Sequence, residues 1–261
     1  MENLNLPIKI SKQKLKSLPI RKIIPNIVTM LAVCAGITSI RYSIGGLYSK
    51  AIICIFLAAI FDMLDGRVAR MLKGSTKFGA ELDSLSDFVS FGVAPAILMY
   101  QWTLFDLKRF GWFFCLLYAI CMAMRLARFN TMLEEEPQPP YWHNFFTGVP
   151  APAAAALACL PIMLHFEFKH LEFLRSDWLC SILMFIVALL MISRIPTIST
   201  KHMKVPTYMV APLFVLVVFL AALIFSKPWM IFSIIAIIYA VTIPVGVYFF
   251  LKSKQAYNTK I

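Results

Sequence analysis

Four aspartates stand close together in an apolar part of the sequence: Asp62, Asp65, Asp83 and Asp87. An aspartate at the centre of a membrane helix costs roughly 2.5–3.5 kcal/mol on insertion scales, so each needs a compensating partner. Carboxylates without nearby histidine or cysteine favour hard divalent cations, Mg²⁺ or Mn²⁺ with Ca²⁺ as an alternative, and several carboxylates can bridge two ions. Carboxylates also accept protons from hydroxyl groups. The cluster therefore predicts metal-dependent chemistry at an oxygen nucleophile.

Helical periodicity places this cluster on two faces. The members are Asp62, Asp65, Gly66, Ala69 and Arg70 on one helix, and Gly79, Asp83 and Asp87 on the next. The connection over residues 73–77 is short, so the two helices should be antiparallel neighbours. We therefore expect the two acidic faces to meet and line one cavity.

The small residues and the arginine of these faces have two interpretations. Glycine and alanine let membrane helices approach closely, and an arginine at a helix end often only marks the cytoplasmic side. Interleaved with aspartates, the same small residues also leave room for a nucleotide. Arg70 would then be placed to bind a diphosphate.

The elements that carry these residues are predicted to be membrane helices. The chain is 60% hydrophobic and 15% charged, whereas soluble domains are roughly 45–50% apolar and about 25% charged. Apolar stretches of the length needed to cross a bilayer recur throughout. They cover residues 24–43, 49–72, 79–102, 109–131, 147–166, 178–195, 207–226 and 229–251. The sequence predicts an all-α integral membrane protein with about eight transmembrane helices.

The distribution of basic residues predicts the orientation. Residues 1–23 form a basic arm that lacks the apolar core and cleavage site of a signal peptide. With this arm in the cytoplasm, most of the 25 lysines and arginines fall on the cytoplasmic side. We expect a multi-pass protein of the cell membrane, with both termini and the acidic cluster at the cytoplasmic face. Topology and anionic lipids account for the net charge of +12, so no nucleic-acid partner is expected.

The composition changes after about residue 195. The carboxylates within apolar stretches all precede this point, whereas the last two stretches are almost purely aliphatic and aromatic. We expect a six-helix catalytic core over residues 24–195. Residues 196–261 would add two packing helices and a basic tail.

The acidic cluster resembles the signature of the CDP-alcohol phosphotransferase family, D-x2-D-G-x2-A-R-x8-G-x3-D-x3-D. All eight fixed positions are matched, from Asp62 to Asp87. The resemblance implies a six-helix core that binds a CDP-linked donor and two divalent cations, releases CMP and passes the remaining phosphoryl group to an alcohol. It also suggests a homodimer.

The resemblance implies a role for each matched residue. Asp62, Asp65 and Asp83 correspond to metal ligands, and Asp87 to a ligand that is also the general base. The expected CDP-binding residues are Asn26, Thr29, Asp62, Asp65, Gly66, Ala69, Arg70, Gly79 and Asp83. Asn26 and Thr29 have a second interpretation as helix-capping residues, because they stand where an apolar stretch begins.

Two further segments bear on the acceptor alcohol. The run R-L-A-R-F-N over residues 125–130 and the run F-T-G-V-P-A-P over residues 146–152 resemble members of the family that use L-serine. This implies transfer of the phosphatidyl group from CDP-diacylglycerol to serine, with Arg125, Arg128 and Asn130 at the acceptor. An arginine can pair with the serine carboxylate. Both arginines could equally be topology markers.

Three alternatives remain. The acceptor could be glycerol 3-phosphate, inositol phosphate or choline, although a phosphorylated acceptor would need a further basic pocket. The aspartates could line the path of a cation channel or transporter, but such a path needs carboxylates spread along its length. The chain could also be a catalytically silent scaffold, although every acid of the signature is intact.

Overall fold

The structure is a computed structural model that describes residues 20–72, 74, 76–132, 145–193, 195–198 and 210–258. Most of the expected basic arm and part of the 73–77 connection lie outside these residues. The described elements are α1 (Ile20–Ile44), α2 (Tyr48–Met71), α3 (Lys77–Asp87), the π-helix η1 (Phe88–Val93), α4 (Ala94–Trp102), the 3₁₀ helix η2 (Leu104–Leu107), α5 (Arg109–Met132), β1 (Phe145–Thr147), α6 (Ala151–Ala158), α7 (Leu160–Glu167), the 3₁₀ helix η4 (Glu172–Arg175), α8 (Asp177–Ile192), β2 (Pro196–Ile198), α9 (Val210–Ser226) and α10 (Pro228–Asn258).

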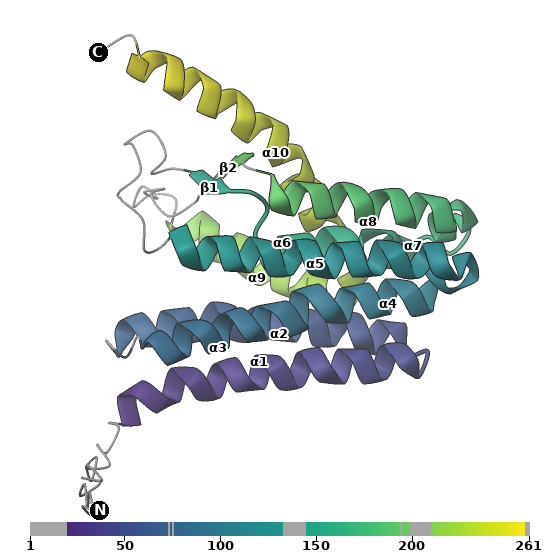
Figure 1. The fold of residues 1–261 in the computed structure, drawn as a ribbon, viewed down its shortest axis with the longest axis horizontal. Helices are drawn as coiled ribbons and strands as arrows, with labels where there is room; N and C mark the ends of the chain where they lie inside the picture. The colour runs from purple at the N-terminus through teal and green to yellow at the C-terminus, as the bar shows by residue number, and fades with distance from the viewer. Residues whose placement is uncertain are drawn as a thin grey trace, which may run out of the picture.

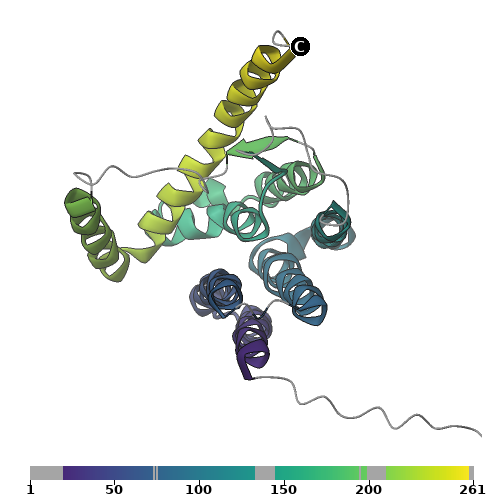
Figure 2. The ribbon, with the colours of Figure 1, turned by 90° about the vertical axis from the view of Figure 1, so that its left-hand side faces the viewer.

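Most helices run side by side along one axis, as Figure 1 shows. Helix α1 packs against α2, α3, η1 and α4, while α5 packs against α8. Helix α10 crosses α6, α7 and β2 and extends away from the bundle (Figure 2). Helix α9 contacts α10 and stands apart from the α1–α5 group (Figure 2).

The helices form a membrane bundle, as the sequence predicted. Four described helical runs are long and apolar enough to span a bilayer, namely 23–44, 77–102, 109–131 and 228–252. Helix α8 is apolar but shorter. Large apolar side chains cover the outside of the bundle, including Phe113, Ile186 and Val218, where lipid tails would surround them. The chain is thus a multi-pass, helical membrane protein.

Two serine hydroxyls join α1 to α3 and η1. Ser86 and Ser90 donate hydrogen bonds to the carbonyls of Thr29 and Ala32, at 3.3 Å and 3.1 Å. This approach requires Gly36, because a Cβ added there would lie 2.9 Å from the Cα of Ser90. Small residues and serines hold membrane helices together in this way, since burial of apolar surface gives little attraction within lipid.

The third apolar stretch is an α-helix interrupted by the π-helix η1. Pro95 follows this turn and has no N–H to donate to the carbonyl of Phe91, four residues earlier. The buried hydroxyl of Tyr118 on α5 donates to that carbonyl at 2.9 Å instead. The bond satisfies a buried acceptor and fixes α5 against η1. The residues that precede Phe91 then lie opposite those that follow Tyr118, as the bond between Ser84 and Asn130 shows.

Two of the predicted helix ranges were wrong at their ends. The range 147–166 begins at the end of strand β1 and becomes helical only at Ala151, between two prolines. The helix is broken at Cys159, and a further proline follows the break at position 161. The range 178–195 stops at Ile192, and β2 follows. The two strands pair antiparallel, with Phe145 opposite Ile198 and Thr147 opposite Pro196.

Candidate active site

The acidic faces of α2 and α3 meet near one end of the bundle. Helix α3 begins at a cap in which the Thr76 hydroxyl accepts a hydrogen bond from the N–H of Gly79 at 2.9 Å. At the end of α2, the N–H of Gly74 donates to the carbonyl of Ala69 at 3.0 Å. These bonds reverse the chain within a few residues, so α3 runs antiparallel to α2, as predicted. The two helices do not pack directly on each other; both pack against α1 and face each other across a cavity.

Three of the four aspartates converge. Asp62, Asp83 and Asp87 each direct one carboxylate oxygen to a common point, and these oxygens lie within 4.8 Å of one another. One oxygen each of Asp83 and Asp87 is buried and makes no hydrogen bond within the described part of the chain. Buried carboxylate oxygens without donors are unfavourable unless a cation binds them. The three side chains therefore fit a divalent metal ion.

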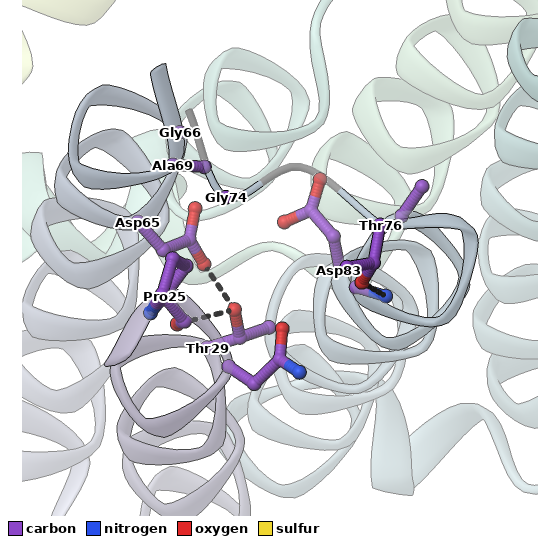
Figure 3. A pocket seen from close by; sticks show the side chains of 11 residues that line it. Pro25, Thr29, Asp65, Gly66, Ala69, Gly74, Thr76 and Asp83 are labelled. Atoms are coloured by element: carbon purple, nitrogen blue, oxygen red, sulfur yellow. Dashed lines mark hydrogen bonds between the residues drawn. The ribbon is translucent and has the colours of Figure 1, made fainter. Parts of the chain in front are cut away.

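Asp65 lies beside this cluster and has a different partner. Its Oδ2 accepts a hydrogen bond of 2.7 Å from the Thr29 hydroxyl, which also contacts the Pro25 carbonyl at 3.1 Å. The Asp65 side chain is almost fully buried. Figure 3 shows Asp65 and Asp83 on opposite walls of one cavity, with their carboxylates directed into the space between them.

That cavity, of about 150 Å³, lies between the N-terminal part of α1, the C-terminal part of α2 and the start of α3. We call it the first cavity. Its wall consists of Pro25, Asn26, Thr29, Asp65, Gly66, Ala69, Gly74, Thr76, Gly79, Ala80 and Asp83 (Figure 3). Most of the predicted CDP-binding residues are on this wall. Asp62 and Arg70 are not among them. Arg70 is exposed and passes Gly66, where an added Cβ would lie 3.8 Å from its Nη1.

Gly79 keeps the first cavity open where α1 approaches α3. A Cβ added at Gly79 would lie 2.9 Å from Asn26 Oδ1 and 3.1 Å from Thr76 Oγ1. Any side chain there would displace the amide of Asn26 or the cap of α3. Close approach therefore explains this glycine better than backbone flexibility does.

A second cavity, of about 270 Å³, adjoins the first. It is lined by Ala80, Asp83, Ser84, Asp87, Arg125, Leu126, Phe129, Asn130, Gly148 and Pro150. Ala80 and Asp83 line both cavities. The aspartate cluster thus lies where two compartments meet, with Asp87 facing the second.

The polar residues of α5 take different positions around the second cavity. Arg125 lies close enough to Asp62 and Asp87 for their charges to interact, and its buried Nε makes no hydrogen bond within the described residues. Asn130 is bonded to Ser84, with its Nδ2 3.0 Å from Ser84 Oγ. Arg125 and Asn130 both line the second cavity, and their predicted role as acceptor-binding residues stays a prediction.

Arg128 is directed elsewhere. Its guanidinium donates to the last carbonyls of α8, those of Met191, Ile192 and Ser193. Gly148 packs against the same helix end with φ of +75°, and an added Cβ would lie 3.0 Å from the Met191 and Ser193 carbonyls. Arg128 thus binds the end of α8, against which Gly148 packs. Its neighbours on α5, Arg125, Leu126, Phe129 and Asn130, line the second cavity instead.

Thr76 and Ser84 belong to the two cavities although the sequence analysis assigned them no role. Thr76 caps α3 in the first cavity, and Ser84 holds Asn130 in the second. A helical pattern was available for Ser84, since Ala80, Ser84 and Asp87 are four and three residues apart and so share a face. For Thr76, the only sequence signal is its place in a short connection, three residues before Gly79, which is a weaker indication of a helix cap.

Fold and site together define a multi-pass membrane enzyme whose carboxylate cluster separates two cavities. Comparison with known families matches residues 22–193 to the CDP-alcohol phosphatidyltransferase family. Residues 208–244 match a second family description, CDP-alcohol phosphatidyltransferase 2. The chain belongs to the CDP-alcohol phosphatidyltransferase family.

The chain is similar to several named enzymes. It is 38% identical over 227 residues to CDP-diacylglycerol–serine O-phosphatidyltransferase of Mycobacterium leprae (strain TN), covering 87% of this chain and 75% of the relative. The enzyme of the same name from Mycobacterium tuberculosis (strain H37Rv) is 37% identical over 226 residues, covering 87% and 78%. Archaetidylserine synthase of Methanothermobacter thermautotrophicus is 36% identical over 177 residues, covering 66% and 68%.

Proposed function

We propose that this enzyme transfers the phosphatidyl group of CDP-diacylglycerol to the hydroxyl of L-serine, giving phosphatidylserine and CMP. The observation that carries the proposal is the position of Asp83 and Asp87 between two adjoining cavities. A donor in the first cavity and an acceptor in the second would meet at these carboxylates. The names of the similar enzymes share a serine product and differ in the lipid, which supports serine as the acceptor.

The reaction is a direct displacement at phosphorus. The serine oxygen forms a bond to the phosphorus that carries diacylglycerol, and the bond from that phosphorus to the bridging oxygen breaks. CMP leaves with that oxygen, and Asp87 accepts the proton of the serine hydroxyl. Asp87 suits this role because it lines the second cavity and has a buried oxygen without a donor.

Asp62, Asp65, Asp83 and Asp87 would hold two divalent cations, Mg²⁺ or Mn²⁺ with Ca²⁺ as an alternative. Bound there, the ions would offset charge on the pyrophosphate and on the departing CMP. The nucleotide would occupy the first cavity, bounded by Asn26, Thr29, Gly66, Ala69 and Gly79, with Arg70 at its exposed edge.

The acceptor would occupy the second cavity. Arg125 would bind the serine carboxylate, because it is the basic residue that lines that cavity and its buried Nε makes no hydrogen bond within the described residues. Asn130 would complete the wall through its bond to Ser84. Arg128 would act on the acceptor indirectly, by fixing Gly148 and the end of α8.

Three further features of the protein follow the family resemblance and the charge pattern. We infer that the end of the bundle that carries the cavities faces the cytoplasm, where Arg67, Arg70 and Lys77 also lie. We infer that residues 24–195 form the catalytic core and that residues 196–261 are an addition to it. A homodimer would be the working unit.

An acceptor panel tests the proposal. Purified protein is incubated with CDP-diacylglycerol, Mg²⁺ or Mn²⁺ and either serine, glycerol 3-phosphate, inositol phosphate or choline, and CMP is measured with and without chelator. We expect CMP release that requires serine and is abolished by the chelator. Release without serine, or release confined to glycerol 3-phosphate, would overturn the assignment of the acceptor.

A further inference from the structure

Both backbone groups of Gly148 are bonded to one short segment that follows α8. The Gly148 N–H donates to the carbonyl of Ile195 at 2.8 Å. The Gly148 carbonyl accepts a hydrogen bond of 2.9 Å from the hydroxyl of Thr197 on β2. Gly148 and Thr197 are both buried, and a buried carbonyl needs a donor. The hydroxyl of Thr197 is therefore the side-chain group that satisfies this carbonyl.

These two bonds fix a turn in the wall of the second cavity. Gly148 and Pro150 line that cavity together with Asp87 and Arg125. Val149, between the two wall residues, is fully buried in the hydrophobic core. Gly148 has a φ of +75°, so the chain reverses sharply at the point where both bonds are made. The position of this turn therefore sets the width of the cavity that contains Asp87 and Arg125.

The strand that carries Thr197 is itself held on two sides. It pairs with β1, where Thr147 lies opposite Pro196, and it also packs against α10 (Figure 1). Only 2% of the surface of Thr197 is exposed at this junction. A hydroxyl on a strand fixed in this way can hold the Gly148 carbonyl at a constant position.

Thr197 lies in a part of the chain to which the family gives no role. It falls between the two matched ranges, residues 22–193 and residues 208–244. It also follows the six-helix core that we infer for residues 24–195. Its hydroxyl nevertheless bonds a wall residue of the second cavity. The shape of that cavity thus depends on a residue outside both matched ranges.

We propose that Thr197 is a positioning residue of the acceptor site, whose hydroxyl holds the turn over residues 148–150 so that the second cavity favours serine over an acceptor with one additional methyl group. The proposal rests on the function proposed above, because it requires the acceptor to bind in the second cavity. Thr197 acts through Gly148, since it is not itself among the described residues that line the cavity.

The test compares Thr197→Val with Thr197→Ser, using the incorporation of labelled L-serine into lipid and its inhibition by L-threonine. Valine keeps the shape of the side chain but leaves the Gly148 carbonyl without its donor, so we expect the serine KM to rise about tenfold. The ratio of the threonine inhibition constant to the serine KM should fall at least about threefold, because a displaced wall leaves room for the extra methyl group. The KM for CDP-diacylglycerol should stay the same. Thr197→Ser keeps the hydroxyl and should preserve the serine KM and the ratio.

A merely structural role of Thr197 would give a different result. Partial unfolding reduces the amount of active enzyme and hence kcat, but it changes neither the serine KM nor the ratio. Thr38→Val is the matched control, because that hydroxyl bonds the carbonyl of Cys34 one turn earlier in α1, at 2.6 Å. This control should keep both values.

Three outcomes would overturn the proposal: an unchanged serine KM in Thr197→Val, an equal rise in Thr197→Ser, or an unchanged ratio in Thr197→Val. Failure of serine to support turnover of the unmodified enzyme would refute the proposed function instead. The same variants would then be compared with the acceptor that does support turnover and with its methylated analogue, and the same three outcomes would decide the role of Thr197.

Discussion

Thr29 on α1 donates a hydrogen bond of 2.7 Å to Asp65 on α2, and both side chains are buried. This bond directs Asp65 into the first cavity, where it faces Asp83, and Asp65 is not one of the three aspartates whose oxygens converge. The first helix of the bundle thus sets the direction of a carboxylate that belongs to the second. Thr29, which also fits a capping role by sequence, lines the first cavity, where we propose that the donor binds.

Substitution of Thr29 by valine should weaken donor binding. The variant keeps the shape of the side chain but leaves Asp65 buried without its donor, at a cost of about 1–3 kcal/mol. We expect a roughly tenfold or larger rise in the KM for CDP-diacylglycerol, measured by CMP release. Thr29→Ser retains the hydroxyl and should stay near the unmodified enzyme. Equal KM values for the valine and serine variants would show that the bond does not matter for the donor.

Substitution of Gly79 by alanine should narrow the first cavity. The new Cβ would lie 2.9 Å from Asn26 Oδ1, closer than ordinary contact allows, so α1 and α3 must separate or Asn26 must move. We expect the KM for CDP-diacylglycerol to rise at least tenfold while the acceptor KM changes little. The matched control is Gly45→Ala, whose Cβ would lie 3.5 Å from its nearest neighbour. A fully active Gly79→Ala enzyme would mean that the nucleotide does not use this space.

Substitution of Arg128 should affect stability more than catalysis. Arg128→Ala leaves the last carbonyls of α8 without their donors, and we expect a loss of about 1–3 kcal/mol, seen as inactivation at lower temperature in detergent. Arg125→Lys should show the reverse pattern, with normal thermal inactivation and a raised serine KM. If Arg128→Ala instead raised the serine KM as much as Arg125→Lys without loss of stability, direct acceptor binding by Arg128 would be favoured.

The sequence predicted the acidic faces well because they depend on local rules. A period of 3.6 residues puts Asp83 and Asp87 on one face, and a short connection returns α3 antiparallel to α2. It did not reveal that Asp65 is not among the converging aspartates, because its partner Thr29 belongs to another helix. Which carboxylates converge depends on how three helices are rotated against one another.

The same limit explains the arginines and the strands. Arg125 and Arg128 are three residues apart, so they share a helical face and looked equivalent in sequence. Their environments differ because α5 packs against the end of α8, whose carbonyls bind Arg128. The pairing of β1 with β2 joins segments that are far apart in the chain, so apolar content alone did not predict the strands and extended one predicted helix into the end of β1 and the other up to the start of β2.

The central claim is that serine reaches phosphorus at the aspartate cluster with Asp87 as the base. The most direct test compares the unmodified enzyme with Asp87→Asn, following CMP release and the incorporation of labelled serine into lipid in the same reaction. We expect equal amounts of both products from the unmodified enzyme. The variant should be folded and bind CDP-diacylglycerol, but lose about 10²–10⁴-fold in kcat. Near-normal turnover by Asp87→Asn, or CMP release without serine in the lipid, would contradict the account.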